Sequence, residues 1–264
     1  KAGEDMKKTL PIQIWEIIYP LGIYFVVANI AMFLAQMLFG SANESYMLCQ
    51  IVASCFTIPF VYRFFRQDQI LVGILKPKPW ISREHLENVL WIIPIAALIG
   101  IGLNNIIQMS PLVHLSETYL QMNQAFYASS MGLELLGSAF VTPLLEELLY
   151  RGVIYGRLRR MMKLVPAVLI SAVIFGAVHF NVVQFVYAFL LGIVLALCME
   201  KSGHMYGAVV AHMTANGIAV IRTETGFLQQ TAEAGAGNIL FSIGCFVAGI
   251  LLLVFYLRRK DSNI

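Results

Sequence analysis

The chain has 264 residues, of which 59% are hydrophobic and 12% are charged, with a formal net charge of +3. Soluble domains carry about 25% charged residues, so this composition excludes an ordinary soluble protein and indicates an integral membrane protein. The net charge is too small to indicate a nucleic-acid-binding protein, and we expect no nucleic-acid partner.

The apolar segments predict an all-α, polytopic membrane protein that forms a single domain over residues 1–264. Several segments approach the ~20 residues that cross a bilayer core. Eight transmembrane helices are expected, at 17–39, 47–65, 87–109, 136–156, 164–182, 183–200, 205–222 and 238–257. The fifth and sixth are separated by almost nothing, so their shared boundary is the least defined.

The basic residues predict the orientation of these helices. Lys and Arg cluster at 1–8, 63–83, 151–163, 201 and 258–260. The connections between the other helix ends, 40–46, 110–127 and 223–237, contain none. Basic residues favour the cytoplasmic side, so both termini are expected in the cytoplasm, with Arg222 as the exception among the basic residues.

Residues 1–5 precede Met6, and we expect them to be a remnant before the natural start. The apolar run from Ile17 is longer than a signal-peptide core and has no obvious cleavage site, which favours a retained first helix. The connection 66–86 contains prolines and Trp80, as expected of a cytoplasmic segment with turns and an interfacial tryptophan.

The longest connection on the outer side is predicted to form an amphipathic helix. Within 112–127, apolar residues recur every three or four positions. This spacing is typical of a helix that lies on the membrane surface. The helix is either a simple surface element or a gate for substrate, and the sequence leaves both interpretations open.

Three motifs place polar residues within or beside these apolar segments: Glu146-Glu147-x-x-x-Arg151, Phe175-x-x-x-His179 and His212-x-x-x-Asn216. An ionisable side chain at membrane depth costs roughly 2.5–3.5 kcal/mol on insertion scales. Such residues are therefore expected to pair with one another or to perform chemistry.

The two carboxylates of the first motif differ in whether a cation lies beside them on the same helix. Glu147 and Arg151 are four residues apart, so they share a helix face and are expected to pair. Glu146 has no cationic partner on its own helix, which favours it for proton transfer. A run of this kind also occurs as a solvated turn at a helix end. Apolar residues continue past Arg151, which favours the buried interpretation.

His212 and Asn216 share a helix face and would suit stabilisation of an oxyanion, while His179 could orient or deprotonate a water with Glu146. Membrane histidines also serve as hydrogen-bonding residues between helices. Counting ~1.5 Å per residue puts His179 near 22 Å and His212 near 11 Å from the cytoplasmic ends. Average helix tilts of about 20°, together with shifted helix ends, could close much of this difference.

The ordered trio of motifs resembles the CPBP family, the group of CAAX prenyl endopeptidases and bacteriocin-processing or immunity proteins also called Abi proteins. The resemblance covers about 130–222. It implies that Glu146 and His179 activate the attacking water and that His212 and Asn216 form the oxyanion hole. Glu147 and Arg151 would support the site. The expected activity is intramembrane hydrolysis of a hydrophobic or lipidated peptide in a prokaryotic cell membrane.

Three alternatives remain open at the level of sequence. Glu146, His179 and His212 could instead hold a catalytic zinc, although the His-Glu-x-x-His signature is absent; we expect no cofactor. A protein of the same family could bind peptides without cleaving them, as an immunity or scaffold protein. A transporter would also use intramembrane Glu and His, but the chain has no internal repeat.

Overall fold

The computed structural model describes residues 9–73 and 83–259. Within these ranges the chain forms helices and turns and no strand, which confirms the all-α prediction. Predictions that fall on residues 1–5 and on the Trp80 region lie outside the described residues.

The longer helices match the predicted segments closely. They are α1 (Leu10–Phe39), α2 (Asn43–Leu71), α3 (Arg83–Gln108), α8 (Leu164–Ala177), α9 (Val182–Ser202), α10 (Tyr206–Thr225) and α11 (Ala236–Arg258). The remaining predicted segment, 136–156, lies in a helical run that comprises α5 (Met131–Glu134), η2 (Leu135–Val141), α6 (Thr142–Glu147), η3 (Leu148–Tyr155) and α7 (Gly156–Met161). The expected helix 164–182 instead ends at Ala177.

In the described part of the chain, five helices are long and apolar enough to cross a membrane: α1, α2, α3 (from His85), α9 and α11. A sixth is added if the run 131–161 and the helix before it count as one bent span. This confirms a polytopic membrane protein. The count of eight spans and the cytoplasmic location of both termini stay predictions.

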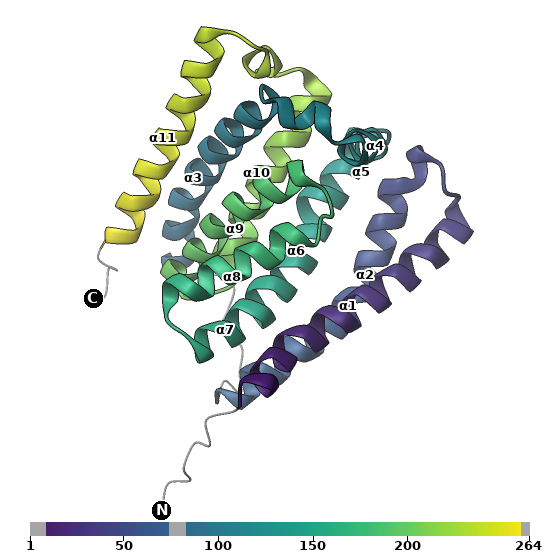
Figure 1. The fold of residues 1–264 in the computed structure, drawn as a ribbon, viewed down its shortest axis with the longest axis vertical. Helices are drawn as coiled ribbons and strands as arrows, with labels where there is room; N and C mark the ends of the chain where they lie inside the picture. Colours follow the sequence, from purple (N-terminus) through teal and green to yellow (C-terminus); the bar gives the residue numbers. More distant parts are fainter. Residues whose placement is uncertain (1–8, 74–82, 260–264) are drawn as a thin grey trace, which may run out of the picture.

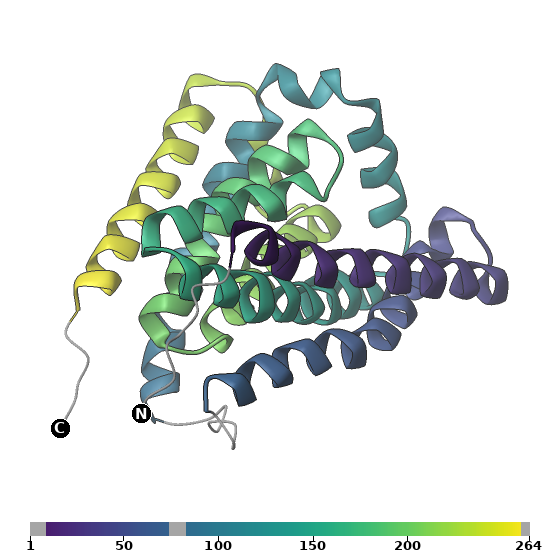
Figure 2. The same ribbon diagram turned by 60° about the horizontal axis from the view of Figure 1, so that its bottom comes forward.

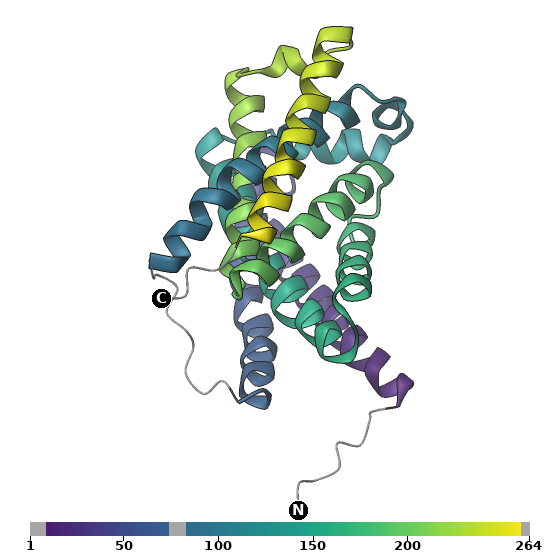
Figure 3. The same cartoon turned by 90° about the vertical axis from the view of Figure 1, so that its left-hand side faces the viewer.

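The helices pack as neighbouring pairs around a central run. α3 packs against α10 and α11, α8 packs against α9, and α1 packs against α2. In Figures 1 and 2 the α1–α2 hairpin lies at one edge of the molecule and α11 at the opposite edge. Figure 3 is seen from the α11 side. In this view α8 and α9 form a hairpin of their own beside α11. The run 131–161 therefore lies among α2, α8 and α10.

The central run is not a regular α-helix. The segments η2 and η3 are π-helical, and the short α6 between them ends at Glu147. π-Helical turns are rare and occur mostly at functional sites. Both glutamates of the first motif thus lie between two stretches of widened helix.

The predicted surface helix within 112–127 forms in two parts. A 3₁₀ turn, η1 (Pro111–Leu115), precedes α4 (Glu117–Phe126). They separate at Ser116 because its side-chain oxygen accepts a hydrogen bond from the Tyr119 N–H and caps α4. α4 makes an angle of 112° with the run 131–161, so it lies across the end of that run.

Arg222, the basic residue that did not fit the charge pattern, is buried. Its guanidinium donates to Asn105 Oδ1 at 2.7 Å and to the Leu228 carbonyl at 3.0 Å. The first contact joins α10 to α3, and the second holds the chain before η4 (Gln229–Ala232). Arg222 is therefore a packing residue between helices, which is why a rule based on exposed loop charges does not describe it.

Candidate functional site

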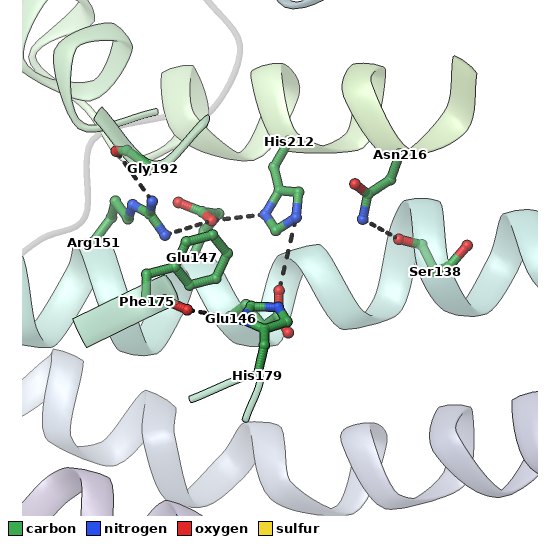
Figure 4. A network of polar contacts seen from close by, with 9 residues as sticks. All are labelled: Ser138, Glu146, Glu147, Arg151, Phe175, His179, Gly192, His212 and Asn216. Carbon is green, nitrogen blue, oxygen red and sulfur yellow. Dashed lines mark hydrogen bonds and ion pairs between the residues drawn. The ribbon is translucent and has the colours of Figure 1, made fainter. Parts of the chain in front are cut away.

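Glu147 is the centre of a buried polar network. Its Oε1 accepts from Arg151 Nη1 at 3.0 Å and from His212 Nδ1 at 2.8 Å (Figure 4). The side chains of Glu147 and Arg151 are both fully buried. The pairing of Glu147 with Arg151 was expected from the four-residue spacing. The contact with His212 was not, because residues so distant in sequence are brought together only by the packing of α10 against α6.

Arg151 is held by contacts that the motifs do not include. Its Nη2 donates to the Gly192 carbonyl of α9 at 3.2 Å, and its guanidinium lies 4.3 Å from the centre of the Phe175 ring. A Cβ on residue 192 would lie 3.2 Å from Arg151 Nη2 and 3.3 Å from Ala172 Cα. Glycine at 192 therefore lets the carbonyl approach the buried cation, and a lone glycine in an apolar segment gave no signal of this.

His179 lies in the turn between α8 and α9, not on a helix as the predicted segment 164–182 implied. Its Nδ1 contacts the Phe175 carbonyl at 2.9 Å, and since a carbonyl only accepts, Nδ1 carries the proton. In the neutral ring Nε2 is then left as a proton acceptor. The next residue, Phe180, has φ +55°, a conformation that is unusual for a bulky residue and forms part of the tight turn.

Phe175 links the two histidines. Its ring centre lies 5.4 Å from that of His179 and 5.7 Å from that of His212, edge-on in both cases. The phenylalanine of the second motif thus contacts three members of the site, counting Arg151. The two histidines therefore lie on either side of one phenylalanine ring, although counting along the helices put them at different depths.

Glu146 differs from Glu147 in exposure and in partners. Its side chain is 18% exposed, whereas that of Glu147 is 0% exposed. Glu146 Oε2 lies 3.7 Å from His212 Nε2, which is within ion-pair range but beyond a good hydrogen bond. Glu146 therefore presents a carboxylate that a substrate or a water can reach.

Asn216 lies one turn after His212 on α10, and its amide donates to the Ser138 carbonyl at 2.9 Å. Ser138 belongs to the π-helical η2, so this contact joins the helix of the third motif to that of the first. An asparagine amide has two N–H groups, and one remains for another acceptor.

The four residues predicted to be catalytic line one cavity of ≈ 520 Å³. Its walls come from α2, α3, α4, the run 131–161, the α8–α9 hairpin and α10. Aromatic and amide residues on α2, α3 and α4 complete the lining. Of these three helices, the sequence indicated a possible role, as a substrate gate, only for α4. These residues lie far from the motifs along the chain, and amides near helix ends carry no distinctive sequence signal.

The same geometry bears on whether the site could hold zinc. Glu146, His179 and His212 all line the cavity. In the parts of the chain that the structure describes, no group of three or more His, Cys, Asp or Glu side chains is arranged to hold a metal ion. His212 Nδ1 is also occupied by Glu147. The arrangement of these described side chains therefore gives no support for a zinc ligand set.

Residues 128–218 match the model of the Rce1-like family, described as type II CAAX prenyl endopeptidase Rce1-like. A curated relative from Bacillus subtilis, named "Putative membrane peptidase YdiL", is 32% identical over 89 residues, which are 34% of this chain and 36% of the relative. The chain thus matches only about a third of that relative's length. No solved structure matches.

The family match falls on the segment that contains all three motifs and the polar network. The family model and the name of the relative both agree with the resemblance to CAAX-type peptidases that the motifs indicate. Over residues 128–218, this chain is similar to the Rce1-like family of type II CAAX prenyl endopeptidases.

Proposed function

We propose that this protein is an intramembrane endopeptidase that hydrolyses a peptide bond of a hydrophobic or lipidated peptide. The observation that carries the proposal is the cavity in which Glu146, His179, His212 and Asn216 meet. It supplies a reachable carboxylate, two imidazoles and an amide inside a membrane protein, where unpaired groups of this kind are costly.

In the proposed reaction Glu146 takes a proton from a water molecule, and the water oxygen attacks the carbonyl carbon of the peptide bond. His179 accepts a hydrogen bond at Nε2 and orients this water, since its Nδ1 donates to the Phe175 carbonyl. The carbonyl oxygen becomes an oxyanion. When the C–N bond breaks, the proton on Glu146 passes to the leaving amine, and no covalent intermediate with the protein forms.

Stabilisation of the oxyanion is assigned to His212 and Asn216. His212 Nδ1 donates to a carboxylate, so a second donor at Nε2 requires the doubly protonated ring. The carboxylates of Glu147 and Glu146 lie 2.8 and 3.7 Å from its two ring nitrogens. Asn216 contributes the N–H that is not bound to Ser138.

Glu147 and Arg151 are positioning residues in this proposal. Arg151 neutralises Glu147, and Glu147 fixes the orientation of the His212 ring, as a buried carboxylate does for the histidine of other hydrolases. Neither is proposed to contact the substrate.

The proposal is tested with purified protein and a library of apolar peptides, with new termini identified by mass spectrometry. We expect cleavage by the wild type, loss of cleavage in His179→Ala and full activity in His114→Ala, which removes an exposed histidine on η1. A protein that binds peptides but yields no new termini, or equal activity in both variants, would refute the proposed enzyme.

A further inference from the structure

The cavity extends beyond the proposed catalytic residues, and its remaining walls carry carboxamides. Gln50 on α2, Asn104 on α3 and Asn123 on α4 all line it. Gln50 and Asn104 are partly buried. In the described part of the chain, the side chains of these three residues make no hydrogen bond to protein.

A carboxamide both donates and accepts, as a peptide group does. A partly buried amide without a partner lacks the hydrogen bonds that stabilise such groups in folded proteins. Tyr127, in the turn after α4, adds a hydroxyl to the same wall. Together these side chains offer an uncharged polypeptide backbone the partners that it needs.

Among the described residues that line it, the same cavity offers no Lys or Arg to a free carboxylate. Arg151 is near but is held by Glu147 and the Gly192 carbonyl. A carboxylate placed against the amide wall would lose hydration without gaining a Lys or Arg partner, and Glu146 would repel it. Sites that recognise a terminal carboxylate usually provide Arg, Lys or a cluster of backbone N–H groups.

We propose that this cavity holds an uncharged stretch of polypeptide through the carboxamides of Gln50, Asn104 and Asn123. Recognition then does not depend on a free C-terminal carboxylate, and the bond that is cut can lie inside a longer chain. This inference rests on the proposed function for the cleavage step, but the recognition step can be measured alone.

The experiment compares two peptides of Leu, Ala and Ser that share one sequence and an acetylated N-terminus. One ends in a carboxylate and the other in an amide. Binding of each peptide to the Glu146→Gln variant is followed by the tryptophan fluorescence of the protein. Cleavage of each peptide is measured with the wild-type protein. We expect dissociation constants within about threefold of each other, a difference below the ~1.4 kcal/mol that corresponds to tenfold.

Matched variants test the amide wall. Asn123→Leu should raise the dissociation constant of both peptides about two- to tenfold, the value of one hydrogen bond. Gln124→Leu, an exposed neighbour on α4 that does not line the cavity, should leave it unchanged. Asn104→Leu gives a second variant on α3 if the first does not fold.

The outcomes separate the two proposals. A peptide acid that binds roughly tenfold or more tightly than the amide would overturn this inference while leaving a peptidase in place. Equal effects of Asn123→Leu and Gln124→Leu would also overturn it. Equal binding of both peptides, sensitive to the amide variants but without cleavage by the wild type, would support the inference and refute the proposed enzyme.

Discussion

Removal of the charge on Glu147 should destabilise the protein, because this residue is the partner of a fully buried arginine. Glu147→Gln leaves Arg151 with the Gly192 carbonyl at 3.2 Å and the Phe175 ring at 4.3 Å. Breaking a buried ion pair by removing one partner costs about 3–5 kcal/mol. The amide oxygen of Gln can still accept a hydrogen bond, so we expect the lower end of that range.

A loss of ~3 kcal/mol should lower the Tm by about 6–12 °C, since a chain of this size loses roughly 2–4 °C per kcal/mol. Thermal unfolding in detergent, followed by tryptophan fluorescence, measures this shift. Glu117→Gln, at an exposed position on α4, is the matched control and should leave the Tm unchanged.

The double variant Glu147→Gln/Arg151→Met separates stability from function. Removing both members of a buried ion pair is often neutral or stabilising, so the double variant should regain most of the lost Tm. Its cleavage activity should stay low, because His212 has lost the carboxylate that orients it. Two results would refute this account of the network. One is a Tm of Glu147→Gln within ~1 °C of the wild type, and the other is a double variant that is less stable than Glu147→Gln.

Three further results are expected. Gly192→Ala places a Cβ 3.2 Å from Arg151 Nη2 and should cost about 1–3 kcal/mol of stability, as overpacking does; an unchanged Tm would contradict the close approach. Asn216→Ala should slow cleavage ~10²–10³-fold, the typical loss for one oxyanion donor, with little change in substrate binding. Cysteines placed at Asn43 and Thr118 should be labelled from outside the cell, and labelling from the cytoplasm would reverse the topology.

The helical fold was largely predictable because a membrane imposes it. A long apolar segment has to satisfy its backbone groups internally, so apolar length alone located the helices. The sequence did not reveal that α8 ends at Ala177 and leaves His179 in a turn, because the residues up to 182 stay mostly apolar. The π-helical turns on either side of α6 also escaped prediction, because they change the helix without changing its composition.

The candidate site was predictable where its contacts are local. The Glu147–Arg151 pair follows from residues four apart on one helix. Two other contacts depend on which helices pack together: His212 with Glu147, and the Arg151 guanidinium with the Gly192 carbonyl. The sequence of each segment alone does not show which helix will be its neighbour. The assignment of catalytic roles remains a prediction that only kinetics can test.

The central claim is that Glu146 activates water for peptide hydrolysis without a metal ion. The most direct test is the cleavage rate of the wild type and of Glu146→Gln, each measured with and without a chelator. We predict that the chelator leaves the wild-type rate unchanged and that Glu146→Gln has no turnover at an unchanged Tm, because an amide does not accept the proton. Turnover by Glu146→Gln, or a wild-type rate that the chelator abolishes and added zinc restores, would contradict the claim.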